Sequence, residues 1–195
     1  MGSDEPAKTP ASPLQQLCER AKVGDEANAL LTAEAATKEF MALLVKKGLF
    51  KDALRLVAYL LPKREAIGWG CLCVRHILAG EKDKPLPDVQ VVAERWVSSP
   101  TEENRWAARQ SAKKEDPTTA SGLLAMAVFF AGPSLSPPNL QAVPPADHLT
   151  SEMVANAVVL AGVAKEPEKA KEKYGVFMQK ALALMARMQQ PQQQQ

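Results

Sequence analysis

The chain has 195 residues, of which 46% are hydrophobic and 24% charged, and its formal net charge is +2. This length suits one domain whose core can fold without disulfides or metals. The near-neutral charge argues against a nucleic-acid binder, because basic residues gather only in pairs such as Lys46-Lys47 and Lys113-Lys114.

The cellular compartment follows from what the sequence lacks. No apolar run approaches the roughly 20 residues that span a bilayer, so we expect no membrane insertion. The polar N-terminus has no signal-peptide core, and three cysteines give no disulfide framework. We therefore expect a cytoplasmic protein.

Polar segments at both ends bracket the expected domain. Residues 1–11 mix Gly, Ser, Asp, Pro and Lys, and residues 189–195 are Gln around one Pro. Neither composition can bury enough apolar surface to fold, so both are predicted to be disordered tails. Residues 12–188 are predicted to form a single helical domain.

The first helices are marked by their end signals. Ser12 before Pro13, with Gln15 three residues on, predicts a helix start, and Ser99-Pro100-Thr101-Glu102 repeats that arrangement. A second helix is predicted over 33–47, ending at a left-handed Gly48.

A third helix is predicted over 50–61, and the fourth, over 63–78, should be the central one. The fourth is apolar around much of its circumference, and Trp69 lies on its main apolar stripe. Gly68 and Gly70 each cost about 1 kcal/mol against Ala in a helix interior. We therefore expect Trp69 in the main core and one of these glycines against the backbone of a neighbouring helix.

Further helices alternate with turns along the rest of the chain. They are predicted over 88–98, over 101–113, from a cap at Thr118 or Thr119 through Phe130, from a cap at Thr150 to about 164, and from near Pro167 onward. Five prolines among residues 133–148 predict an extended loop, the Pro-rich loop. Since no window alternates with period two, the predicted fold is all-α: a compact orthogonal bundle of about eight helices, with a short HEAT-like stack as the alternative.

Residues 63–78 also contain the only cluster that suggests catalysis. Cys73 and His76 share a helix face, as a nucleophile and a base would, and Arg64 and Glu65 begin the helix. An apolar stripe would raise the pKa of a thiol, however, and no third orienting group is evident. Cys71 and Cys73 point roughly 200° apart on a helix, so they should be buried free thiols rather than metal ligands. We expect no catalytic, cofactor or metal site.

The interaction candidates lie in two segments. Arg64, Glu65 and Arg75 have charges that suit the helix dipole or a buried network, and Trp69 is the aromatic anchor of the same helix. Pro137-Pro138 and Pro144-Pro145 favour polyproline II, which partner grooves can recognise. The alternative, which we favour, is a strap laid over the bundle with Leu135, Leu140 and Val143 tucked in.

These features predict a non-enzymatic interaction protein or accessory subunit that binds another protein. The other reading is an enzyme of unknown reaction that uses Arg64, Glu65, Cys73 and His76. The sequence predicts no oligomeric state.

Residues 60–71, Leu-Leu-Pro-Lys-Arg-Glu-Ala-Ile-Gly-Trp-Gly-Cys, resemble an uncharacterised bacterial family with a Leu-Pro-x-Arg-Glu-Ala stretch before a Trp-containing segment. The Pro-rich loop running into His148-Leu149-Thr150 is similar too, and the likeness covers roughly residues 35–165. The resemblance implies a bacterial origin and no established activity or catalytic residues. It also implies gene neighbourhoods with type VI secretion components and forkhead-associated-domain proteins.

Overall fold

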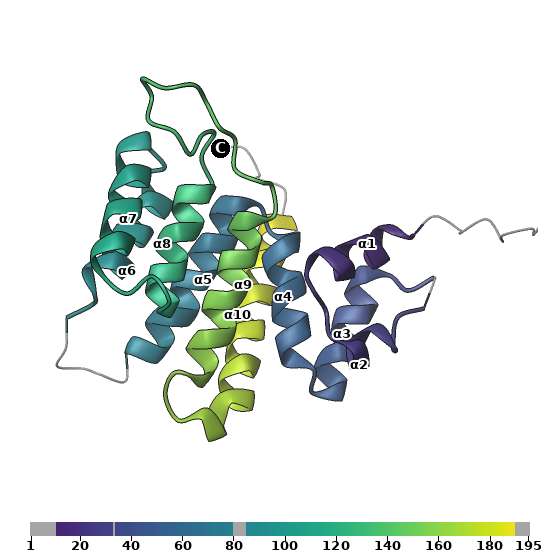
Figure 1. Cartoon of the computed structure of the whole chain (residues 1–195). Helices are drawn as coiled ribbons and strands as arrows, with labels where there is room; N and C mark the ends of the chain where they lie inside the picture. Colours follow the sequence, from purple (N-terminus) through teal and green to yellow (C-terminus); the bar gives the residue numbers. More distant parts are fainter. Residues whose placement is uncertain (1–10, 33, 80–84, 190–195) are drawn as a thin grey trace, which may run out of the picture.

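The computed structural model describes residues 11–32, 34–79 and 85–189. Within them the chain forms ten α-helices, one 3₁₀ helix and no strand (Figure 1), which confirms the all-α prediction. The elements are α1 (Pro13–Arg20), α2 (Asp25–Asn28), α3 (Thr37–Lys47), α4 (Phe50–Leu60), α5 (Lys63–Leu78), α6 (Asp88–Ser98), α7 (Glu102–Lys114), α8 (Ala120–Phe130), α9 (Leu149–Val163), η1 (Pro167–Lys169) and α10 (Ala170–Gln189).

Three predicted helix ends are confirmed by their hydrogen bonds. Ser12 and Gln15 form a reciprocal capping box at the start of α1. Gly48 ends α3 with a φ of 79°, a left-handed conformation that glycine adopts without steric cost. The Thr119 hydroxyl accepts the Gly122 N–H at the start of α8. Side-chain oxygens and glycine thus satisfy the unpaired backbone groups at these ends.

Two other predicted caps are wrong. Ser99 does not begin α7, because Thr101 is the residue whose hydroxyl accepts the Asn104 N–H. Thr150 lies inside α9 and is buried, while His148 occupies the N-cap position. In both places the sequence offered two polar residues within three positions, and local spacing alone could not choose between them.

The remaining differences concern helix lengths. The four-residue α2 was not predicted, and α3 starts at Thr37 rather than at residue 33, which lies outside the described residues. A 3₁₀ turn precedes α10, and α10 continues through Gln189. Of the two predicted tails, residues 1–10 and 190–195 lie outside the described part of the chain.

Helices α5, α8 and α9 form the centre of the bundle. Helix α9 packs on α8, α5, α4 and α10, and α8 packs on α7 and α6 as well (Figure 1). Helices α1 to α3 lie beside α4 at one side of this bundle. No helix among the described residues has both the length and the apolar character needed to cross a bilayer.

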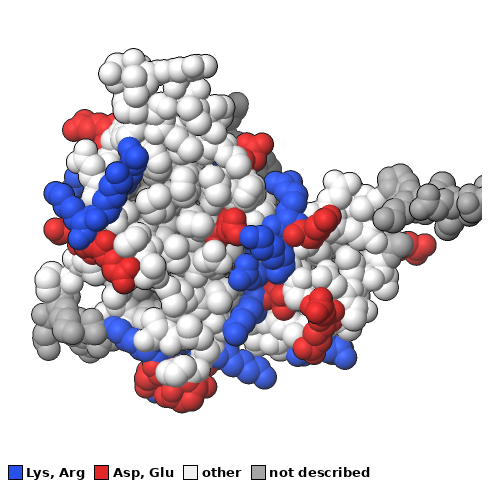
Figure 2. Space-filling view, in the orientation of Figure 1, with Lys and Arg blue, Asp and Glu red and all other residues white. Residues whose placement is uncertain are grey.

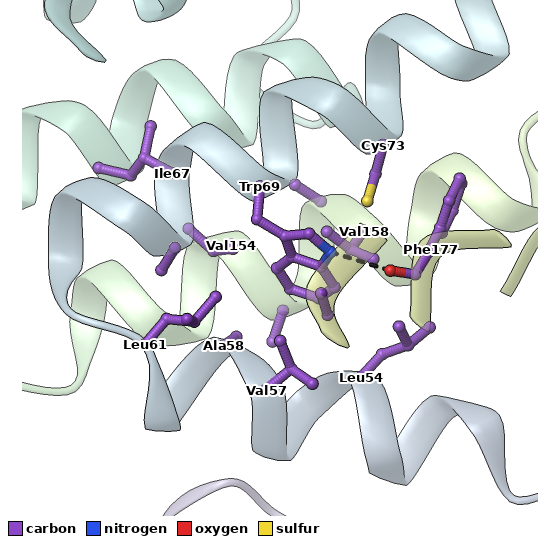
Figure 3. Packing of buried hydrophobic residues seen from close by; sticks show 14 of the residues in the cluster. Leu54, Val57, Ala58, Leu61, Ile67, Trp69, Cys73, Val154, Val158 and Phe177 are labelled. Carbon is purple, nitrogen blue, oxygen red and sulfur yellow. Dashed lines mark hydrogen bonds between the residues drawn. The ribbon is translucent and has the colours of Figure 1, made fainter. Parts of the chain in front are cut away.

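Trp69 lies at the middle of the core, as predicted. Its side chain is 1% exposed and packs among residues of α4, α5, α9 and α10 (Figure 3). The indole N–H donates a 3.0 Å hydrogen bond to the Phe177 carbonyl oxygen of α10. The polar atom of this large ring is therefore satisfied within the core, as buried tryptophans require.

The nearest atoms that face the two glycines beside Trp69 belong to side chains of neighbouring helices, whereas the prediction named backbone. A Cβ added at Gly70 would lie 2.6 Å from Leu124 Cδ2 and 3.4 Å from Val154 Cγ1. One added at Gly68 would lie 3.2 Å from Val97 Cγ1. Both glycines make room for branched side chains of facing helices, which is a packing reason for their helix-weakening presence.

Replacing Gly70 with leucine is expected to destabilise the protein by about 1–3 kcal/mol through overpacking. The new side chain would overlap Leu124, which is fully buried and cannot move into solvent. Urea unfolding followed by far-UV circular dichroism measures the change. Gly175, whose added Cβ meets nothing within 4 Å, provides the control: Gly175→Ala should not destabilise.

Candidate functional site

The four interaction candidates of α5 all line a single groove; they are Arg64, Glu65, Trp69 and Arg75. It runs between α5 and α6, has a volume of about 410 Å³, and Leu184 of α10 also lines it. The α5 residues Arg64, Gly68, Leu72 and Arg75 recur at spacings of four, four and three, so they follow one helix face. The groove floor is mainly apolar, and its charged residues are Arg64, Glu65, Arg75 and Glu94.

Arg64 binds the end of the neighbouring helix. Its Nε donates to the Val97 carbonyl at 2.7 Å and its Nη2 to the Ser98 carbonyl at 3.4 Å, both in the last turn of α6. These carbonyls have no partner within their own helix, and a cation there also complements the helix dipole. The contact with the end of α6 therefore explains why an arginine stands in the first turn of α5. This contact could not be predicted from the sequence.

Arg75 belongs to a polar network that reaches from the groove into the core. Its guanidinium makes two hydrogen bonds to the Glu94 carboxylate, and these raise the pKa of Arg75 above its ordinary value. The fully buried Gln90 donates to Glu94 Oε1 at 2.9 Å and accepts from the Ser121 hydroxyl at 3.0 Å. The only sequence signal for this network is one glutamine on the apolar face of α6.

The residues of the alternative enzyme do not meet. Arg64 and Glu65 line the groove, whereas Cys73 is fully buried in the core and His76 is exposed, with its ring edge-on to Phe177. Burial raises the pKa of the Cys73 thiol, which disfavours the thiolate that a nucleophile requires. Within the described residues no group of three or more His, Cys, Asp or Glu could hold a metal ion.

The thiols are expected to react slowly with a thiol reagent in the native protein and rapidly after denaturation. Cys18, Cys71 and Cys73 are all free and buried, and burial raises the pKa of Cys71 to about 12. A time course with a chromogenic disulfide reagent, with and without urea, measures both rates. Fast stoichiometric labelling of Cys73 in native protein, located by peptide mass, would contradict this arrangement.

The Pro-rich loop holds a defined shape of its own. At its base the Leu135 N–H donates to the Val143 carbonyl at 2.8 Å, and the Ser134 hydroxyl accepts from the N–H groups of Ser136 and Val143. At its tip the Leu140 N–H donates to the Pro137 carbonyl at 3.0 Å, which closes a β-turn. Hydrogen bonds at its base and at its tip therefore hold the loop in a defined shape, so it is not freely extended.

The exposed side chains of this loop contradict the strap. Leu140 is 61% exposed and Val143 50%, while Leu135 is half-buried at the base. Pro137, Pro138 and Pro144 are exposed as well, and Pro145 is half-buried. The loop projects from one end of the bundle instead of covering it (Figure 1).

The loop also presents an unusually uncharged surface. Residues 133–146 contain no Asp, Glu, Lys, Arg or His. In the space-filling view the projecting end of the molecule is accordingly white, while blue and red side chains gather lower down (Figure 2).

A buried arginine fixes the start of the loop, and little in the sequence indicates its role. Arg105 is 1% exposed, makes two hydrogen bonds to the Glu102 carboxylate at 2.8 and 2.7 Å, and donates to the Phe129 carbonyl at 2.9 Å. These bonds lower the pKa of Glu102. A Cβ at Gly132 would lie 2.3 Å from the Arg105 side chain, so a larger residue there would have to displace Arg105. The one indication in the sequence is that Arg105 lies on the same face of its helix as Ala108 and Ala112.

Comparison with known protein families matches residues 40–185 to a family of unknown function (DUF6931). The match begins inside α3 and ends inside α10, so it includes both the groove and the Pro-rich loop. It agrees with the resemblance to an uncharacterised family. No curated protein and no solved structure matches the chain.

Proposed function

Because the chain belongs to DUF6931, a family of unknown function, we propose its role from its surface: it is a non-enzymatic interaction protein that docks a partner protein through the Pro-rich loop. The observation that carries the proposal is a pinned, uncharged loop that exposes Leu140 and Val143. Exposed apolar side chains on a fixed backbone are typical of docking elements, because little conformational entropy is lost on binding.

The chemistry of the loop indicates the kind of surface that it fits. Leucine, valine and proline side chains without charge suit an apolar or aromatic-lined groove on the partner. Binding should therefore be driven by apolar burial and change little with salt, since no ion pair of the loop contributes.

We further propose that the partner belongs to a bacterial multi-protein system in the cytoplasm, such as the type VI secretion apparatus. The resemblance of residues 60–71 and of the Pro-rich loop to a bacterial family with such gene neighbours motivates this part. The chain would then act as an adaptor or accessory subunit rather than as an enzyme.

Affinity purification from the native host tests the proposal. Wild-type protein should capture a partner that Leu140→Asp and Val143→Asp each fail to capture, because a charge on the loop would have to be desolvated in the partner's groove. Val91→Asp on α6, also at an exposed apolar site, is the matched control and should capture the partner normally.

Thermal unfolding shows that the loop variants are folded, since both side chains lie largely in solvent. Two outcomes would overturn the docking role of the loop: a partner retained by both loop variants, or no partner above background with wild-type protein. A captured partner with no relation to secretion would overturn only the type VI assignment.

A further inference from the structure

Helix α4 is buried on two faces, and its outer face is covered by the N-terminal helices. Leu54 and Val57 of α4 point towards Trp69 in the core (Figure 3). Leu56 projects roughly 160° away from Leu54 around the helix axis, and yet it is fully buried. Helices α1 and α3 pack on α4 from that side (Figure 1), so the N-terminal helices keep Leu56 from solvent. We call α1, α2 and the turn between them, residues 13–28, the N-terminal lid.

The N-terminal lid is held by modest packing and by two polar contacts. Its buried side chains are mostly small: Leu14, Cys18, Ala21, Val23 and Ala27. The Gly24 N–H donates to the Asp52 carboxylate of α4 at 2.9 Å. The largely exposed Lys22 forms an ion pair with Glu152, which joins the lid to α9 as well. Since apolar stabilisation scales with the area buried, the lid is held less strongly than the central helices.

The turn after α1 is strained at Lys22. The φ of Lys22 is 53°, in the left-handed region where glycine is the usual residue after a helix. The N–H groups of Lys22 and Val23 donate to the carbonyls of Glu19 and Cys18, both at 3.0 Å, which is the bonding pattern that such a glycine makes. A lysine in this conformation carries a steric cost, and its side chain is the one that reaches Glu152.

Glu152 is the acid that balances the cations at this edge of the lid. The hydrogen bond to Glu152 and its charge raise the pKa of Lys22, whereas the charge of Arg55 on α4 acts in the opposite direction. His148 Nε2 lies 3.7 Å from the other Glu152 oxygen. Removing the carboxylate would leave Lys22 facing Arg55, so attraction between the lid and the bundle would turn into repulsion.

We propose that the N-terminal lid opens from α4 while the bundle stays folded, and that the Lys22–Glu152 ion pair makes its closure sensitive to ionic strength. Local opening of a peripheral segment requires less free energy than unfolding the whole domain. A helix of eight residues is not stable alone in water, so α1 unravels on opening and the strain at Lys22 is released. The open state uncovers the Leu56 face of α4, a second apolar surface.

The family match is consistent with a bundle that is distinct from its lid. The lid precedes residues 40–185, the region that matches the family, whereas its partner Glu152 lies within that region. The proposal does not depend on the Pro-rich loop, which lies at the end of the bundle and contributes no contact described for the lid.

Cys18 reports the opening, because it is buried on the lid while Cys71 and Cys73 are buried on α5. Full-length protein is alkylated with uncharged iodoacetamide at about pH 8, where an ordinary histidine is neutral, and peptide masses give the rate at each thiol. Cys18 should react more than about tenfold faster than Cys73, although far more slowly than in urea. Equal rates at the three thiols would show that the lid opens only when the whole domain unfolds, which would overturn the proposal.

A core substitution separates local opening from global unfolding. Trp69→Phe weakens the bundle equally in the open and closed states, so it should speed the alkylation of Cys73 and leave that of Cys18 unchanged. If both thiols became faster by the same factor, Cys18 would be exposed only by global unfolding, and the lid would not exist as a separate unit.

The ion pair is tested by substitution and by salt. Glu152→Gln should speed the alkylation of Cys18 by about two- to fivefold, the range for an exposed ion pair. Sodium chloride should speed it in the wild type by screening the attraction, but not in Glu152→Gln, where repulsion between Lys22 and Arg55 remains. Glu166→Gln removes an exposed ion pair with Lys169 beyond the far end of α9 and is the matched control, without effect on Cys18. The same salt response in wild type and Glu152→Gln would overturn the role of the ion pair.

Two substitutions at Lys22 test the strain. Lys22→Ala removes the ion pair and keeps the left-handed strain, whereas Lys22→Gly removes both. Cys18 should therefore react about fivefold faster in Lys22→Ala than in Lys22→Gly, because a residue with a Cβ favours the open lid. Equal rates would overturn the contribution of strain. Far-UV circular dichroism confirms that each variant keeps the helical bundle.

Discussion

Replacing Trp69 with alanine is expected to lower the free energy of unfolding by about 3–5 kcal/mol, the usual cost of deleting a fully buried large aromatic side chain. The ring lies where α4, α5, α9 and α10 meet, so no single helix can shift to fill the cavity (Figure 3). The substitution also removes the hydrogen bond to the Phe177 carbonyl. Urea unfolding monitored by circular dichroism measures the change.

Trp69→Phe separates the two contributions. Phenylalanine keeps most of the buried apolar volume and loses the indole N–H, so it should cost much less than alanine. If Trp69→Ala unfolded like the wild type while partner binding was lost, Trp69 would be a surface anchor. The core described above would then be wrong at its centre.

Arg105→Met is the second substitution with a large expected effect, a loss of about 2–4 kcal/mol, since it removes charge-assisted hydrogen bonds from a buried position. Methionine keeps an unbranched apolar stem but cannot donate to Glu102 or to the Phe129 carbonyl. That carbonyl belongs to the last turn of α8 and would lose its side-chain partner. Thermal and urea unfolding of the variant measure the loss.

Arg109→Met is a matched control for Arg105→Met. The Arg105 guanidinium also lies over the Trp106 and Phe129 rings, 5.1 Å from each centroid. The Arg109 guanidinium lies over the same two rings, 5.1 and 4.7 Å from their centroids, but this residue is only half-buried. Its loss should cost roughly 1 kcal/mol, the value of a partly solvated cation–π contact. Equal effects of the two substitutions would show that stacking, rather than the hydrogen bonds, is what makes Arg105 important.

The sequence predicted those features that depend on neighbours in the chain. The apolar circumference of residues 63–78 was enough to identify a central helix, and the left-handed glycine after Lys47 ended α3 where the pattern required. Hydrophobic periodicity and end signals act over one or two turns, so they can be read without knowledge of the fold.

Contacts between distant segments could not be predicted in this way. The Arg64 side chain binds carbonyls 33 and 34 residues away, and which surface it meets depends on how α5 and α6 pack. The four α5 residues selected from the sequence nevertheless all line the groove, although nothing in the sequence showed that a groove existed.

The prediction that the Pro-rich loop lies over the bundle was wrong because it relied on composition alone. Leu140 and Val143 were assigned to the core because they are apolar, but a single backbone link between Leu135 and Val143 closes the loop upon itself before it can reach the bundle. A turn of this kind depends on which hydroxyl accepts which N–H. Several such pairings are open to a segment rich in Ser and Pro.

Helices α8 and α9 pack on each other more extensively than any other pair, and the loop that joins them contributes little to that packing. Lengthening a flexible connection costs little: each doubling adds only about 0.6 kcal/mol of closure entropy. The turn at Asn139-Leu140 is therefore a natural place to graft a peptide epitope or a small fluorescent domain without unfolding the bundle. The same tolerance would let loops of different length and chemistry be exchanged on one helical frame.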